Sequence, residues 1–264
     1  MRKYKFHRMN TNILQTLITA MQRRLAALPQ RLRPFTTEFD ELPKNLMLTG
    51  ARGCGKSTFL DMLCGLLTPA TGELLLNGTP LSMSNTNIGY MLQKDHLFEW
   101  RTIYSNMLLG LEIQGRVTPE TKKHVENLLE NYGLYKFRNS RPSQLSGGMR
   151  QRAALIRTLA LEPDLLLLDE PFSALDYQTR LSVGDDIGTI IRREGKTAIL
   201  VTHDIAEAVS MADRVIIFSN RPALVQKIVN IKFSMAERTP MASRNAPEFK
   251  TYFNEIWKEL NVHG

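Results

Sequence analysis

Two short stretches of the chain carry residue types suited to phosphate chemistry. The first, Gly50 to Ser57, reads GARGCGKS. Its glycines let successive backbone N–H groups curve around phosphate oxygens where a Cβ atom would clash. A helix that follows such a loop points its positive end at the same phosphates, and the lysine reaches the β- and γ-phosphates. The predicted phosphate-binding residues are Gly50, Ala51, Arg52, Gly53, Cys54, Gly55, Lys56, Ser57 and Thr58.

The second stretch, Leu165 to Glu170, reads LLLLDE and pairs a buried strand with acids. Four leucines in a row predict a strand covered on both faces, so the strand ends in two adjacent carboxylates. Such acids are often only a solvated strand end, but the complete phosphate loop favours a catalytic pair. Asp169 would then hold Mg²⁺ together with the hydroxyl of Ser57, and Glu170 would act as general base on the attacking water.

From residue 45 onward, short apolar runs alternate with helical periods, which predicts an α/β fold with a parallel-sheet core. The expected strands are Leu46 to Leu48, Leu74 to Leu76, Leu165 to Leu168, Thr197 to Val201 and Val215 to Phe218. The expected helices begin near Lys56, Gly147, Gln178 and Ile205.

Residues from about 99 to 148 interrupt this alternation and predict a helical subdomain. Thr118 and Pro119 supply a cap and a first-turn proline, and Gly133 ends the predicted helix. A further amphipathic helix is expected between Phe249 and Leu260. We therefore expect one catalytic domain over residues 45–264.

Residues 1–44 form a basic segment of a different character. The net charge of the chain is +8, and residues 1–37 hold eight lysines and arginines with no acid, so the rest is formally neutral. Apolar residues from Ile13 to Leu28 lie at helical spacing. This pattern is open to three interpretations: a helix packed on the domain, a membrane-surface helix or an organelle transit peptide.

The charge distribution and the composition limit the partners and the cellular compartment that we expect for the protein. Because the charge excess lies outside the main domain, it gives no support to a nucleic-acid partner. The two cysteines, Cys54 and Cys64, form no disulfide framework, which fits a reducing cytosol. No stretch approaches the roughly 18 apolar residues that cross a bilayer, so any membrane role would come through a partner or a surface contact.

The sequence LSGGMRQR, from Leu145 to Arg152, closely resembles the signature motif of the ABC ATPases. Ser146, Gly147 and Gly148 stand at a predicted helix start, where backbone N–H groups suit a γ-phosphate. The resemblance implies that this phosphate is presented by a second ATPase subunit, so that the protein works as a homodimer.

Other elements of that family occur in the same order along the chain. Gln93 resembles the Q-loop glutamine, which touches Mg²⁺ and responds to the membrane partner. Asp176, in SALD, resembles the D-loop aspartate. His203, in VTHD, resembles the switch histidine that contacts the γ-phosphate and positions the water. The resemblance therefore implies Glu170, His203 and Gln93 as catalytic residues, and Ser57, Gln93 and Asp169 as ligands of Mg²⁺.

The resemblance covers about residues 45–261 and implies an ABC cassette, a P-loop core with a helical signature subdomain. It implies ATP as substrate, transmembrane permease subunits as partners and a place on the cytoplasmic face of the membrane. The stretches from Gln93 to Arg101 and from Asp176 to Arg180 resemble the nitrate, sulfonate and taurine importers. In such importers an external solute-binding protein delivers the solute.

Two features depart from the family pattern. Members normally begin with antiparallel strands that carry an aromatic side chain stacked on adenine, and no such context is visible around Tyr4, Phe6, Phe35 or Phe39. Arg52 replaces a small polar residue in the phosphate loop.

The alternatives to an importer ATPase are a degenerate cassette that does not hydrolyse ATP and a non-transport ABC ATPase acting on nucleic acid or the ribosome.

Overall fold

The computed structural model describes residues 45–50, 53–70, 72–76, 79–81, 86–220, 223–235 and 238–262. The predictions made for residues 1–44, and for Ala51 and Arg52, lie outside these residues. The chain divides into two compact units, one of residues 1–36 and 58–84 and the other of residues 37–57 and 85–264. Helix α2 (Lys56–Leu63) spans the boundary between them.

Within the first unit, Leu75 belongs to a small hairpin and not to the main sheet. Strands β2 (Leu75–Leu76) and β3 (Thr79–Pro80) pair with each other antiparallel. The prediction that Leu74 to Leu76 adds a strand to the main sheet is therefore wrong. A short apolar run cannot by itself identify its partner strand, and here Leu75 is 54% exposed, as no strand inside the sheet would be.

The second unit is built on a six-stranded sheet in the order β4-β5-β6-β1-β7-β8. Its strands are β1 (Asn45–Gly50), β4 (Ile88–Met91), β5 (Leu165–Asp169), β6 (Thr197–Val201), β7 (Arg214–Phe218) and β8 (Val225–Asn230). All neighbours pair parallel except β7 and β8, which pair antiparallel. The parallel core is confirmed, whereas the antiparallel edge strand β8 and the strand β4 were not predicted.

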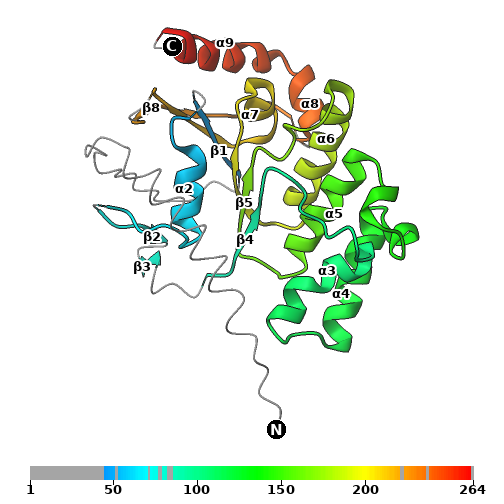
Figure 1. Ribbon diagram of the computed structural model, residues 1–264. Coiled ribbons are helices and arrows are strands. Elements are labelled where there is room, and N and C mark those ends of the chain that lie inside the picture. Colours follow the sequence, from blue (N-terminus) through cyan, green and yellow to red (C-terminus); the bar gives the residue numbers. More distant parts are fainter. Residues whose placement is uncertain are drawn as a thin grey trace. The chain divides into compact units, whose positions relative to one another are not determined.

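Helices α5 to α9 form a connected layer beside this sheet (Figure 1). The helices of the unit are α3 (Ile103–Ile113), α4 (Pro119–Asn131), α5 (Gly147–Leu159), α6 (Tyr177–Arg193), α7 (Ile205–Met211), α8 (Pro240–Asn245) and α9 (Pro247–Val262), with 3-10 turns η2 (Tyr135–Phe137) and η3 (Pro142–Gln144). Helix α5 packs on β4, α7 on β1, and α9 on β7 and β8. Helices α3 and α4 pack on α5, which carries the predicted signature residues at its start.

The predicted signals for α4 are confirmed at both ends. Thr118 and Thr121 form a reciprocal capping box around Pro119, in the first turn of the helix. The helix stops at Asn131, and Gly133 adopts a φ of 73°, which favours glycine. Local sequence chemistry therefore determines where this helix begins and ends.

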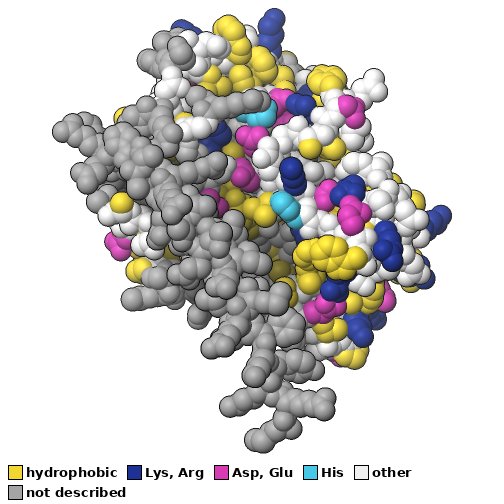
Figure 2. Space-filling view, in the orientation of Figure 1, with side chains coloured by type: hydrophobic (Ala, Val, Ile, Leu, Met, Phe, Trp, Pro, Cys, Tyr) yellow, Lys and Arg dark blue, Asp and Glu magenta, His cyan; other side chains and the backbone are white. Residues whose placement is uncertain are grey.

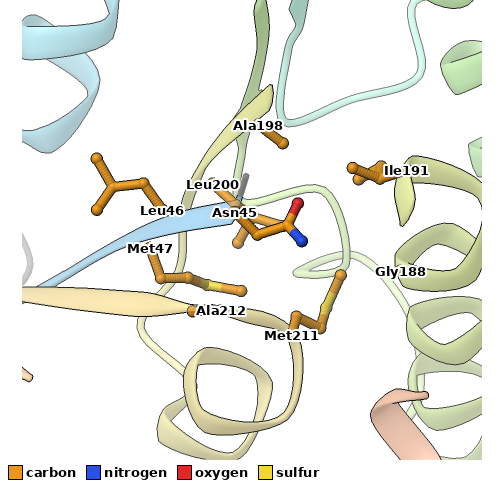
Figure 3. Close-up of a pocket in the computed structure, with 9 residues that line it drawn as sticks. All are labelled: Asn45, Leu46, Met47, Gly188, Ile191, Ala198, Leu200, Met211 and Ala212. Carbon is orange, nitrogen blue, oxygen red and sulfur yellow. The ribbon is translucent and has the colours of Figure 1, made fainter. Parts of the chain in front are cut away.

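The core of the unit includes a small apolar cavity, shown in Figure 3. It is lined by Asn45, Leu46, Met47, Gly188, Ile191, Ala198, Leu200, Met211 and Ala212. Asn45 is the first residue of β1 and Gly50 is the last, so the cavity lies at the opposite end of the strand from the glycine loop. We therefore regard it as a packing defect of the core and not as the phosphate site.

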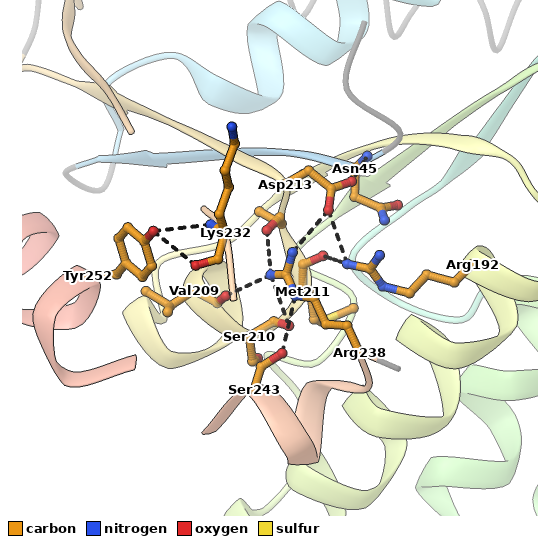
Figure 4. A network of polar contacts seen from close by, with 11 residues as sticks. Asn45, Arg192, Val209, Ser210, Met211, Asp213, Lys232, Arg238, Ser243 and Tyr252 are labelled. Carbon is orange, nitrogen blue, oxygen red and sulfur yellow. Dashed lines mark hydrogen bonds and ion pairs between the residues drawn. The ribbon is translucent and has the colours of Figure 1, made fainter. Parts of the chain in front are cut away.

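Arg238 fastens the C-terminal part of the chain to the end of α7 (Figure 4). Its guanidinium donates to the backbone oxygens of Val209 at 3.2 Å and Ala212 at 2.6 Å, and to Asp213 Oδ1 at 3.0 Å. Burial, together with the charge of Arg192, lowers the pKa of Arg238 to about 10. Arg238 remains charged at neutral pH and satisfies carbonyls that the short helix leaves unpaired.

The surface seen in Figure 2 carries basic and acidic side chains interspersed over the helices α3 to α6. In this view the two signs of charge alternate among the described residues of these helices. In the part of the chain that the structure describes, no helix has both the length and the apolar character needed to cross a membrane.

Candidate active site

The candidate active site lies where three neighbouring parallel strands end. Strands β5, β6 and β1 are adjacent in the sheet, and they end at Asp169, Val201 and Gly50. Because the carboxyl ends of parallel strands meet at one edge, the residues that follow these strands come together. The topology thereby joins the glycine loop, the acidic pair and His203, which are far apart in the sequence.

The glycine loop requires glycine for conformational and steric reasons. Gly53 and Gly55 have φ values of 74° and 113°, a region that side chains disfavour. At Gly50 a Cβ atom would lie 2.8 Å from the backbone oxygen of Phe218. Lys56 is only 7% exposed, and its Nζ donates to the Gly50 backbone oxygen at 2.9 Å.

Lys56 therefore lies over the loop, where its charge can meet a phosphate. Of the other residues predicted here, Cys54 is buried with its Sγ 3.6 Å from Lys56 Nζ, whereas Thr58 belongs to the first unit.

Ser57 and Asp169 present the oxygen atoms expected of a Mg²⁺ site. Ser57 Oγ donates to Asp169 Oδ1 at 3.2 Å. Adjacent ligands of an octahedral Mg²⁺ lie about 2.9 Å apart, given metal–oxygen distances of about 2.05 Å, so the two oxygens fit neighbouring positions. Among the described residues no group of three or more His, Cys, Asp or Glu could hold a metal. This composition suits an ion that takes its other ligands from phosphates and water.

Glu170 is the point on which the predicted catalytic residues converge. Its Oε2 lies 3.4 Å from Gln93 Nε2 and 3.4 Å from His203 Nδ1. Its backbone has a φ of 44°, which costs a non-glycine residue about 1 kcal/mol or more and aims the side chain off the strand end. Its N–H donates to the Val201 oxygen at 2.9 Å, which fixes the turn.

Ser173, the first residue of the SALD stretch, completes this arrangement. Its Oγ accepts from Gln93 Nε2 at 3.1 Å and donates to the Glu170 backbone oxygen at 3.0 Å. The predicted D-loop residue Asp176 caps α6 by accepting from the Thr179 N–H, and hydrogen bonds from the side chain and the backbone of Thr179 lower the pKa of Asp176. With its Nε2 donating, Gln93 keeps its amide oxygen for a cation.

His203 is held by its neighbours on both sides. The N–H of Thr202 donates to the Leu48 oxygen at 3.1 Å, and its hydroxyl donates to the buried Glu207 at 2.5 Å. Asp204 caps α7 by accepting from the N–H groups of Ala206 and Glu207. Sequence reasoning missed Thr202 and Glu207, although the spacing of Asp204 and Glu207 is typical of a helix start.

The signature residues lie at the start of α5, and two of the three face outward. Ser146 Oγ accepts from the Met149 N–H at 3.3 Å, and Ser146 and Gly147 are exposed. Gly148 is buried, and a Cβ atom there would lie 2.6 Å from Val183 of α6. Gly148 therefore serves the packing of α5 on α6, while Ser146 and Gly147 remain accessible to a group from outside the chain.

Comparisons with known proteins show the family of the chain. The family model described as "ABC transporter" matches residues 41–173. An uncharacterized ABC transporter ATP-binding protein of Bacillus subtilis is 49% identical over 80% of this chain and 82% of its own length. The taurine import ATP-binding protein of Roseobacter denitrificans is 38% identical over 72% of this chain and 70% of its own. The nitrate import ATP-binding protein of a Synechocystis strain is 37% identical over 78% of this chain and 79% of its own length.

Among solved structures, a dimeric ATP-binding cassette in a post-hydrolysis state with ADP and Pi superposes with a TM-score of 0.63. The match covers 78% of this chain and 94% of that one, at 26% identity. The sheet order and the convergence on Glu170 are thus found in a chain whose relatives bind and hydrolyse ATP. The protein belongs to the ABC transporter family and is an ATP-binding subunit with ATPase activity.

Proposed function

We propose that this chain is the ATP-hydrolysing subunit of an importer for a small solute of the nitrate, sulfonate or taurine type. The observation that carries the proposal is the convergence of Gln93 and His203 on the Glu170 carboxylate, at 3.4 Å each. A degenerate cassette has no need to keep all three. The similarity to taurine and nitrate import ATP-binding proteins supports the solute class.

In this proposal each group has a defined role in hydrolysis. Lys56 and the loop N–H groups bind the β- and γ-phosphates of ATP. Glu170 accepts a proton from the attacking water, while His203 keeps the carboxylate and the water aligned. Bound Mg²⁺, held by Ser57, Asp169 and Gln93, would neutralise charge on the phosphates as the bond to the γ-phosphate breaks.

A second copy of the chain completes the site in this proposal. Ser146 and Gly147 are exposed at the start of a 13-residue helix whose N–H groups suit an anion. Each subunit would bind ATP in its own glycine loop and present these residues to the partner's γ-phosphate. The dimeric cassette that superposes on this chain supports the arrangement.

A membrane-spanning permease is the second proposed partner, and an external solute-binding protein acts through it. The contact surface lies near Trp100, which is 71% exposed and whose ring packs at a tilt against Phe98 with a centroid distance of 4.7 Å. Leu92, beside Gln93, is 43% exposed. Large exposed apolar side chains near a catalytic residue suit a partner that must sense the nucleotide. The subunit would accordingly lie on the cytoplasmic face of the membrane.

Complementation tests the solute class directly. Cells that lack the chain should fail to grow when a sulfonate or taurine is the sole sulfur source, or nitrate the sole nitrogen source. The intact chain should restore growth, whereas Lys56→Ala should not. Growth of the deleted cells on all of these solutes, with no other uptake system for them, would reject the importer assignment.

A further inference from the structure

The loop that follows Gln93 is bound to the signature helix α5 by a network of charged groups. Arg150 Nε donates to Asp95 Oδ2 at 2.8 Å and Arg150 Nη2 to Asp95 Oδ1 at 3.2 Å, a two-pronged ion pair. A third contact joins Arg150 Nη1 to Glu99 Oε1 at 2.8 Å. Because each of the three guanidinium nitrogens donates to a carboxylate, Arg150 fixes the orientation as well as the distance of the loop.

A second arginine of α5 holds the backbone of the same loop. Arg157 donates to the backbone oxygens of Asp95 at 2.7 Å and His96 at 2.6 Å. His96 has a φ of 46°, so the loop takes a conformation that a free loop would avoid. The loop is thus attached to α5 at several points and cannot move alone.

The ion pair is partly shielded from water, which strengthens it. The side chains of Arg150 and Asp95 are 26% and 19% exposed. Burial raises the pKa of Asp95, but the hydrogen bonds from Arg150 and from the Leu97 N–H, together with the charges of Arg150 and Arg157, outweigh it and hold the pKa below its usual value. The pair is therefore charged at neutral pH and does not act as a pH switch.

Asp95 and Arg150 are close in sequence to different groups of the proposed composite ATP site. Asp95 follows Gln93 by two residues, and Gln93 contacts Glu170 and Ser173. Arg150 follows Ser146 by four residues, one helical turn, and Ser146 begins the helix. A shift of Gln93 toward the nucleotide would therefore pull on the first turn of α5.

We propose that the Asp95–Arg150 pair is a positioning link that transmits the state of the chain's own ATP site, sensed by Gln93, to Ser146 and Gly147. The ion pair would determine when Ser146 and Gly147 can bind the γ-phosphate of the ATP that the partner subunit holds. The link rests on the proposed function, because it presumes the composite site. Neither Asp95 nor Arg150 touches the reacting atoms.

Stability of the fold does not account for the pair. Helix α5 is already anchored by buried Leu155 and Ile156 and capped by Ser146. A matched control exists in the ion pair of Arg101 with Glu112, at 2.7 Å and with Arg101 23% exposed. This pair joins α3 to the residues just before it, and has no contact with α5 among the described hydrogen bonds and ion pairs.

The test uses the full chain carrying Glu170→Gln, so that ATP is not consumed. Asp95→Asn, Arg150→Gln and the double variant are compared with the control Glu112→Gln. Sedimentation with Mg²⁺ and ATP gives the dimer dissociation constant. A fluorescent ATP analogue, at protein concentrations below dimerisation, gives nucleotide affinity. A thermal melt shows whether each variant folds.

The link predicts that each single variant weakens ATP-dependent dimerisation by about tenfold or more, the order expected for lost charge-assisted hydrogen bonds. Nucleotide affinity should stay within about threefold, less than 0.7 kcal/mol by the same conversion. The double variant should be no worse than the singles, because one contact is lost in each. Glu112→Gln should leave dimerisation unchanged.

Four results would overturn the link. Variants that dimerise like the parent would show that the pair transmits nothing, and additive losses in the double variant would show two independent roles. An equal loss of nucleotide affinity and dimerisation would show a general defect of the site. If the Glu170→Gln parent forms no ATP-dependent dimer, the composite site itself fails and the link fails with it.

Discussion

His203 Nδ1 lies 3.4 Å from Glu170 Oε2, although the two residues follow different strands and are separated by 33 positions in the sequence (203 − 170 = 33). The contact depends on β5 and β6 being paired in register, with Asp169 opposite Val201. A histidine at this distance can hold the carboxylate and a water in line with the same phosphate. The register of the sheet therefore brings the two members of the proposed catalytic pair together.

Replacing Glu170 with glutamine should separate ATP binding from hydrolysis. The amide keeps the shape of the side chain and its contact with His203, but it cannot accept a proton from water. We expect turnover to fall by about a hundredfold or more with little loss of ATP affinity. Steady-state phosphate release and equilibrium binding measure the two quantities. Near-normal turnover would remove Glu170 from the role of general base.

Mixing two inactive variants tests whether the site is shared between subunits. In a mixed dimer of Lys56→Ala and Ser146→Arg chains, one composite site carries both changes and the other carries neither. We therefore expect activity to reappear on mixing, up to about half the normal rate for the mixed dimers if the sites act independently. A mixture that stays as inactive as its two components would contradict a shared site.

The buried Glu207 should make stability depend on pH. Burial raises its pKa from 4.5 to about 7, although the Thr202 hydroxyl opposes this. The folded chain then binds the proton more tightly than the unfolded chain between those values. This contribution is fully present below about pH 4.5 and is lost as pH rises through about 7, a change of at most about 3 kcal/mol.

Glu207→Gln removes this dependence, since the amide can still accept from Thr202. We expect the variant to gain stability relative to the parent between about pH 5.5 and about pH 8, by about 2 kcal/mol. Urea unfolding at both pH values measures it, with Glu130→Gln, an exposed glutamate of α4, as the control. An equal difference at both pH values would show that Glu207 does not titrate in this range.

Much of the fold follows from local sequence signals, because caps and apolar runs act over a few residues. Thr118, Pro119 and Gly133 marked the bounds of α4, and four leucines marked β5. The strand β4 was not predicted, because Ile88–Met91 is only four residues long and its glycine and tyrosine interrupt the apolar run. The partner of a strand is set by distant packing, so neither the hairpin at Leu75 nor the antiparallel β8 could be predicted locally.

The candidate site shows the same division. The motifs identified Gln93, Asp169, Glu170 and His203 one by one, but only the sheet order shows that Gln93 and His203 meet at Glu170. Arg238 lies outside the motifs, and the SALD stretch does not itself show that Ser173 contacts Gln93. Their roles depend on backbone oxygens made available by the fold, which no residue pattern displays.

Arg238 should contribute more to stability than an ordinary surface arginine. Arg238→Met would remove a donor from carbonyls at the end of α7 and one of the donors to Asp213, which keeps Arg192 and the Asn45 N–H, so we expect a loss of about 2–4 kcal/mol. Arg116→Met removes an exposed ion pair at 4.0 Å and should cost less than about 0.5 kcal/mol. Urea unfolding of both variants makes the comparison. Equal losses would contradict the clamp at α7.

The central claim is that this chain hydrolyses ATP in order to drive a permease. The most direct measurement is steady-state ATPase activity of the purified chain, alone and reconstituted with its membrane-spanning partners, with Glu170→Gln as the inactive control. We predict that the chain hydrolyses ATP and that the partners increase its turnover. With Trp100→Ala the partners should no longer increase turnover, and Glu170→Gln should abolish it. The account would be contradicted if the chain showed no turnover either alone or with its partners, or if the partners left its turnover unchanged.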